Sequence, residues 1–61
     1  MKRFELKFKT LDLVVYYSVE DNEIIINKIF IKNTTINITP FIFELNLQDQ
    51  IMDLIRENAN R

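Results

Sequence analysis

Residues 13–32 read LVVYYSVEDNEIIINKIFIK, and this stretch decides the fold. β-Branched and aromatic residues, which favour strands, fill both of its halves. Between the halves stand Asp21 and Asn22, two residue types that tolerate the left-handed backbone of a tight turn. A turn there predicts a hairpin with strands at about 13–20 and 23–32. The pairs that follow from this turn are Val19 with Ile24, Tyr17 with Ile26, Val15 with Lys28, and Leu13 with Phe30.

The segment before this hairpin predicts another strand, at about residues 2–9. Its apolar residues Phe4, Leu6 and Phe8 alternate with charged ones, which is typical of a half-buried strand. The lysines among those charged residues suit a position at the sheet edge, where they discourage further strand addition. A tight connection at Thr10 and Leu11 would pair Phe8 with Leu13, Leu6 with Val15, and Phe4 with Tyr17.

Both turns place apolar residues on the same face of the sheet, and a slip of one residue would expose them all. Lys28 is the one polar residue that this register puts among them. The predicted core face consists of Phe4, Leu6, Phe8, Leu13, Val15, Tyr17, Val19, Ile24, Ile26 and Phe30.

A short fourth strand is predicted at about residues 35–39, after a turn at Asn33. A three-residue loop would place Ile36 and Ile38 on the core side, whereas a two-residue loop would place them on the back; the three-residue loop is preferred. Residues 40–44 form either a fifth short strand or, as we favour, a helical turn with Thr39 as its cap and Pro40 in its first position.

From Leu47 the apolar period becomes helical, and Leu47, Ile51, Leu54 and Ile55 form one stripe. This predicts a helix at about 47–59 with Asn46 as its N-cap. The sequence therefore predicts an α+β fold with a single domain over residues 1–61. In this fold an antiparallel β-meander of three to four strands carries one C-terminal α-helix on one face.

The chain contains no glycine, cysteine or histidine. Phosphate-binding loops and nucleophile elbows need glycine, thiol chemistry needs cysteine, and most zinc sites and serine triads need histidine. Ser18, the one serine, would need an unusual lysine partner. We therefore expect a non-enzymatic protein with no cofactor, no metal and no small-molecule substrate.

The candidate functional regions are therefore surfaces that could bind a partner. One helix covers one sheet face, so an apolar ridge on the back should stay open as an interface, most simply in a homodimer. The alternative is that neighbouring Lys and Glu side chains cover it. The predicted ridge consists of Val14, Tyr16, Ile25, Ile29 and Ile31.

Two charged regions are further candidates. Glu20, Asp21 and Glu23 cluster at the hairpin tip and could dock on a basic partner or simply form a solvated turn. The first strand is basic and carries Phe4 and Phe8, as nucleic-acid platforms do. Alternation, however, turns both phenylalanines toward the core, away from the charges.

No membrane association is expected. Residues 1–9 alternate, whereas a signal peptide needs an unbroken apolar region, and the longest apolar run, residues 13–17, is too short to span a bilayer. The expected location is cytoplasmic.

The order of segments resembles small uncharacterised β-meander proteins with a C-terminal helix that bacteriophages and prophages encode. The resemblance rests on Phe4-x-Leu6-x-Phe8, residues 22–26, Ile36-x-Ile38 and residues 50–55. It implies an accessory role in infection, in the host cytoplasm, and carries no catalytic residue across. The leading hypothesis is an interaction module, such as an inhibitor or modulator of a host protein. The alternatives are a nucleic-acid-binding module using the first strand, and an assembly factor of a virion or mobile element.

Overall fold

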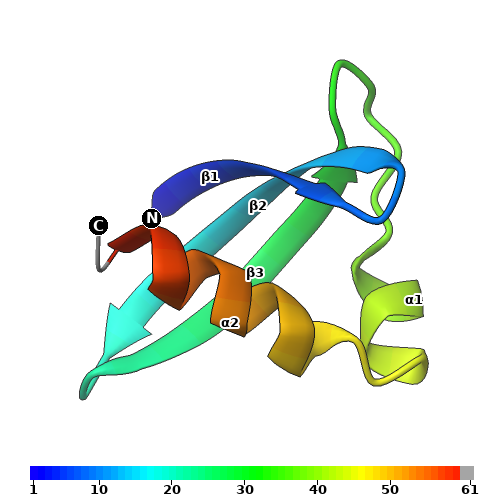
Figure 1. The fold of residues 1–61 in the computed structure, drawn as a ribbon. Helices are drawn as coiled ribbons and strands as arrows, with labels where there is room; N and C mark the ends of the chain where they lie inside the picture. Colours follow the sequence, from blue (N-terminus) through cyan, green and yellow to red (C-terminus); the bar gives the residue numbers. More distant parts are fainter. Residues whose placement is uncertain (60–61) are drawn as a thin grey trace.

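The computed structural model describes residues 1–59 and contains a three-stranded antiparallel sheet followed by two helices (Figure 1). The strands pair in the order β1-β2-β3, so the predicted α+β fold with a β-meander is confirmed. In chain order the elements are β1 (Lys2–Phe8), β2 (Leu11–Glu20), β3 (Glu23–Ile31), α1 (Thr39–Glu44) and α2 (Gln48–Ala59).

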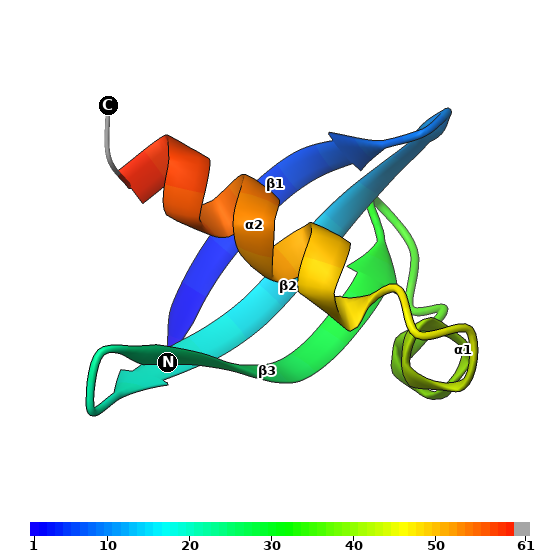
Figure 2. The same ribbon diagram turned by 60° about the horizontal axis from the view of Figure 1, so that its bottom comes forward.

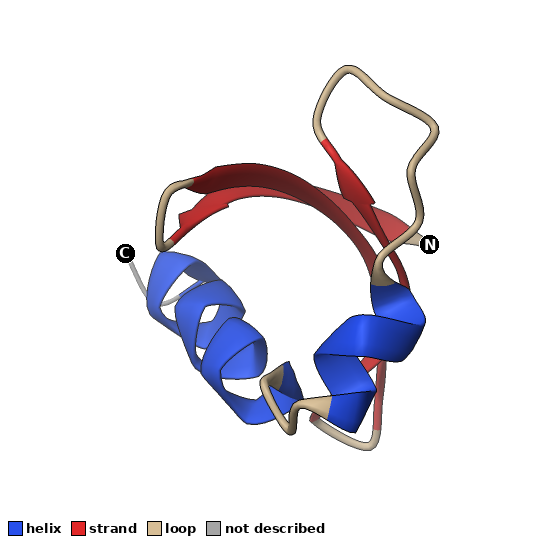
Figure 3. Ribbon diagram, turned by 90° about the vertical axis from the view of Figure 1, so that its right-hand side faces the viewer, coloured by secondary structure: helices blue, strands red, loops and turns tan. Residues whose placement is uncertain are grey.

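The sheet is curved, and both helices lie on its concave side (Figure 3). Helix α2 crosses the strands diagonally and contacts β1 and β3, whereas α1 packs beside β3 at one end of the sheet (Figure 2). Apolar residues from all five elements meet between the layers, as expected for an amphipathic helix on a half-buried sheet. The buried core consists of Phe8, Leu13, Val15, Ile26, Ile29, Ile42, Ile51 and Ile55.

The turn between β2 and β3 is the predicted one. Asp21 and Asn22 have φ values of 52° and 66°, and Glu20 pairs with Glu23 across them. Positive φ at both central residues matches the right-handed twist of the flanking strands. The predicted pairs Val19 with Ile24 and Tyr17 with Ile26 are confirmed.

The connection between β1 and β2 is tighter than predicted. Phe8 pairs with Leu11 rather than with Leu13, so only Lys9 and Thr10 form the turn, and Lys9 has a φ of 57°. The predicted register is therefore wrong by two residues. Because side chains alternate with a period of two, this shift leaves every residue of β1 on its predicted face.

The predicted register of β3 is also wrong beyond Asn27. Tyr17 pairs with Ile26 but Tyr16 pairs with Lys28, so Asn27 is an extra residue, a β-bulge. The bulge reverses the alternation that follows it. Ile29 and Ile31 lie on the core side, and Lys28 and Phe30 lie on the back, each on the face opposite to the one predicted.

No fourth strand follows within the described residues, so the predicted strand at 35–39 is wrong. Phe30 and Asn37 form an isolated bridge, and the segment then turns into α1. The Asn37 side chain causes the turn, since its Oδ1 accepts hydrogen bonds from the backbone N–H and the hydroxyl of Thr39 at 2.9 and 2.6 Å. Ile38 packs against the core, as the three-residue loop required, but Ile36 is exposed.

Residues 40–44 are helical, as favoured, with Pro40 in the first turn of α1. The predicted caps differ. Thr39 is the first residue of α1 instead of its cap, and its hydroxyl oxygen accepts a hydrogen bond from the Ile29 N–H at 2.8 Å.

Asn46 ends α1 instead of capping α2. Its φ is 57°, its N–H donates to the Phe43 carbonyl, and the N–H of Leu47 donates to the Ile42 carbonyl. This is a Schellman motif, in which a left-handed residue lets the chain satisfy the last carbonyls of a helix. Asparagine takes the place that glycine usually holds. Asn46 therefore directs the chain from α1 into α2.

In the part of the chain that the structure describes, no helix combines the length and the apolar character needed to cross a membrane.

Candidate functional site

The structure divides the predicted ridge between the two faces of the sheet. Ile29 is fully buried in the core, and Ile31 packs against the same core, so assigning these two residues to the back was wrong. The bulge at Asn27 is the cause, because it turns both isoleucines inward. Val14, Tyr16 and Ile25 lie on the convex face as predicted, and of these Ile25 is 39% exposed.

Aromatic packing covers part of the convex face. Phe30, which the bulge turns outward, meets Tyr16 edge to face with ring centroids 6.0 Å apart. Phe30 is also the cross-strand partner of Val14, which is only 6% exposed. The convex face is therefore not the open apolar ridge that the sequence predicted.

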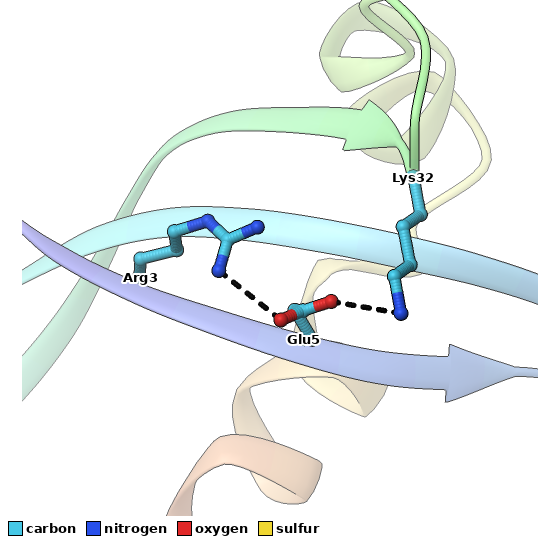
Figure 4. Close-up of polar contacts among 3 residues, drawn as sticks. All are labelled: Arg3, Glu5 and Lys32. Atoms are coloured by element: carbon cyan, nitrogen blue, oxygen red, sulfur yellow. Dashed lines mark hydrogen bonds and ion pairs between the residues drawn. The ribbon is translucent and has the colours of Figure 1, made fainter.

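Arg3, Glu5 and Lys32 form a network of ion pairs (Figure 4). The Glu5 carboxylate on β1 forms two ion pairs. Its Oε2 lies 3.1 Å from Arg3 Nη1, and its Oε1 lies 3.0 Å from Lys32 Nζ. Lys32 lies just beyond β3, so its pair with Glu5 reaches across β2. Hydrogen bonding and charge from Lys32, with Arg3, lower the pKa of Glu5, and the Tyr16 hydroxyl and Glu5 raise the pKa of Arg3.

The basic first strand does not present an aromatic platform. Phe8 is buried in the core and Phe4 packs against it, as the alternation predicted. Two of the basic residues near this strand, Arg3 and Lys32, are already paired with Glu5. Stacking on bases needs accessible rings, and these two phenylalanine rings belong to the core.

The acidic tip is assembled as the sequence predicted. Glu20, Asp21 and Glu23 are all exposed at the end of the β2–β3 hairpin, and Glu20 pairs directly with Glu23. Like charges in directly opposite positions repel. No group of three or more acidic residues with the geometry to hold a metal ion occurs among the described residues.

The β1–β2 turn and α1 lie at the same end of the sheet (Figure 1). Residues of both line a surface that the sequence did not reveal. We call it the α1 groove. It encloses about 310 Å³, and eight of its ten lining residues are apolar. It is lined by Phe8, Lys9, Thr10, Leu11, Leu13, Ile38, Phe41, Ile42, Leu45 and Leu47.

The floor and the rim of the α1 groove differ in exposure. Its floor is core, because Phe8, Leu13 and Ile42 are buried. Its rim carries Leu11, Phe41 and Leu45, which are 47%, 62% and 66% exposed. The α1 groove therefore opens directly onto the hydrophobic core, at a place where no other element of the described chain covers it.

Local backbone geometry explains why these rim side chains stand in water. Helix α1 has six residues, and only Ile42 among them is buried. At about 100° per residue, Phe41 and Leu45 lie on one flank of the helix and Phe43 on the other. The sequence signal was the run Phe41-Ile42-Phe43-Glu44-Leu45, since a single helical turn cannot bury four large apolar residues on one side.

The β1–β2 turn supplies the one charged group in the lining. The ammonium group of Lys9 lies 5.5 Å from the centre of the Phe8 ring, over the groove floor. Lys9 forms no ion pair with any of residues 1–59. The groove thus offers apolar contact together with one unpaired positive charge.

Comparison of this chain with models of protein families, with curated protein sequences and with solved structures found no match.

Proposed function

We propose that this chain is a non-enzymatic protein–protein interaction module that binds through the α1 groove. The exposure of Leu11, Phe41 and Leu45 around a floor of core residues is the observation that carries this proposal. At these exposed fractions each side chain presents on the order of 100 Å² or more to water, so together they reach the size of functional apolar patches. Burial of this surface by a partner is favourable, and no element of the described chain covers it.

The groove defines the chemistry of the segment that it accepts. Its volume suits about two side chains of the size of leucine or phenylalanine, which is how apolar anchors fill a pocket at the centre of an interface. Lys9 favours an acidic residue beside those anchors. A short amphipathic helix with apolar residues four apart and a neighbouring carboxylate meets both requirements.

A displayed library of short peptides tests the proposal directly. Peptides selected on the wild-type protein should carry two apolar anchors and an acidic residue. Leu45→Asp should abolish their binding, because it places a carboxylate on the groove rim opposite the incoming anchor.

Ile25→Asp is the matched control, since Ile25 is an exposed apolar residue on the convex face. Leu45→Asp should keep the melting temperature of the wild type within a few degrees, because Leu45 is 66% exposed. Ile25→Asp should remain folded at the assay temperature with a lower melting temperature, because Ile25 is 39% exposed and lies within β3. Selected peptides that bind the Leu45→Asp variant as tightly as the wild type would contradict the proposal.

A further inference from the structure

Helix α1 itself carries the chemistry that the groove accepts. Phe41 in α1 and Leu45, the C-cap residue that follows it, are four residues apart on the same flank, and both are more than half exposed. Glu44 is exposed next to them and forms no ion pair with any residue the structure describes. The same short segment thus provides one wall of the groove and the type of ligand that would fill it.

We infer that the groove is occupied by α1 of a second copy of this chain, in a twofold-symmetric dimer. This inference rests on the proposed function of the groove and names its partner. In a twofold contact the same patch is used on both copies, so a patch that holds both a groove and its matching ligand is self-complementary. Phe41 and Leu45 of each copy enter the groove of the other.

The charges of the groove fit this arrangement. Lys9 lies on the wall of the groove that the β1–β2 turn forms, and Glu44 lies on α1. When α1 of one copy docks in the groove of the other, Glu44 of the first copy therefore comes next to Lys9 of the second. Two such pairs form, one for each groove. Like charges would meet instead if the copies packed Lys9 against Lys9, so the pairing also sets the orientation.

The area predicts a weak, reversible dimer. The three rim side chains together expose on the order of 350 Å² on each copy, and a twofold contact buries this on both sides. This is less than the roughly 1,000 Å² expected of a stable biological interface, so the contact belongs to the weak and transient class. We therefore expect dissociation in the micromolar range or above, so the dimer competes with a partner protein for the same groove.

Sedimentation equilibrium of charge-reversed variants provides the test. Lys9→Glu and Glu44→Lys should each weaken the dimer by about tenfold, because each replaces two attractions by two repulsions. An equimolar mixture of the two variants should dimerise with nearly the wild-type dissociation constant, since in the mixed dimer one groove pairs the introduced Glu with the introduced Lys and the other pairs the native Lys9 with the native Glu44. The double variant Lys9→Glu with Glu44→Lys should do the same.

Each failure has a separate reading. A wild type that stays monomeric up to millimolar concentration overturns the second-copy inference, and so does a dimer whose affinity neither reversal changes. In both cases peptides that bind the wild type but not Leu45→Asp would leave the proposed function intact. Restored dimerisation in the mixture supports the inference and identifies α1 as the occupant.

Discussion

Val15 on β2 lies directly opposite Ile29 on β3, in the place where the β2–β3 turn alone would have put Lys28. The bulge at Asn27 makes this exchange and removes the one polar residue from the predicted core face. It also gives Phe30 to the convex face, where it packs against Tyr16. One extra residue thus completes the core and closes much of the opposite face.

Ile29→Val tests the burial that the bulge produces. Ile29 is fully buried, so loss of one methylene group should lower the free energy of unfolding by about 0.5–1.5 kcal/mol. Ile25→Val is the matched control on the convex face and should change it by less than about 0.5 kcal/mol. Urea denaturation measures both. Equal losses would contradict the assigned faces of β3.

Thr39→Val tests the hydrogen bond that replaces a fourth strand. The Thr39 hydroxyl accepts from the Ile29 N–H and donates to Asn37 Oδ1; valine keeps the shape but removes both hydrogen bonds and leaves the Ile29 N–H unsatisfied. We expect a loss of about 1–3 kcal/mol in unfolding free energy, together with faster hydrogen exchange at the Ile29 amide.

Thr35→Val, at an exposed position in the preceding loop, is the control and should leave both quantities nearly unchanged. An Ile29 amide that exchanges at the wild-type rate in the Thr39→Val variant would show that another group satisfies it.

Asn46→Ala tests the Schellman motif. A left-handed backbone conformation costs alanine about 1 kcal/mol or more, whereas glycine adopts it without this cost. Thermal unfolding should therefore place Asn46→Ala below the wild type and Asn46→Gly at or above it. An Asn46→Gly variant that is less stable than the wild type would instead support the N-cap role that the sequence predicted for Asn46, because glycine caps a helix N-terminus less well than asparagine does.

Glu5→Gln tests the ion pairs of the convex face. Lys32 and Arg3 lower the pKa of Glu5 from its ordinary value of 4.5, so the ionised form stabilises the folded chain. This contribution is fully present above pH 4.5 and disappears as the pH falls through the lowered pKa. The wild type should therefore be more stable than Glu5→Gln near neutral pH, and the difference should vanish on acidification.

The control for this comparison is Glu57→Gln, which removes an exposed carboxylate on α2. Urea midpoints measured for all three proteins at neutral pH and at about pH 3 give the two differences. A Glu5 difference that grows as the pH falls would contradict the assigned direction of the pKa.

The comparison of sequence and structure separates what local patterns determine from what tertiary packing determines. Alternation in residues 2–8 and the turn at Asp21 and Asn22 predicted the sheet, because both signals are local. The bulge at Asn27 was not predicted, although one signal of it was present: the predicted register placed a single polar residue, Lys28, on the otherwise apolar core face. Counting residues from the turn cannot reveal a bulge. It becomes evident only when the packing of the core requires Ile29 and Ile31 to face inward.

The α1 groove could not be predicted for a related reason. Whether Phe41 and Leu45 are buried depends on where Asn46 turns the chain, and asparagine is common both at helix N-caps and in left-handed turns. Because Asn46 was predicted to be the N-cap of α2, the sequence offered no residue at which α1 should end. Lys9 at positive φ was also unexpected, since a bulky residue rarely adopts this backbone.

The most direct test of the α1 groove as the surface through which two copies of this chain associate is a dilution series followed by amide NMR, from millimolar to micromolar protein. We predict concentration-dependent shifts confined to the groove, in residues 9–13 and 38–47, with the acidic tip at residues 20–23 unchanged. Leu45→Asp should abolish these shifts while the remaining spectrum stays that of the folded protein. Shifts at Tyr16 and Ile25 with a silent groove would contradict the account and return the interface to the convex face.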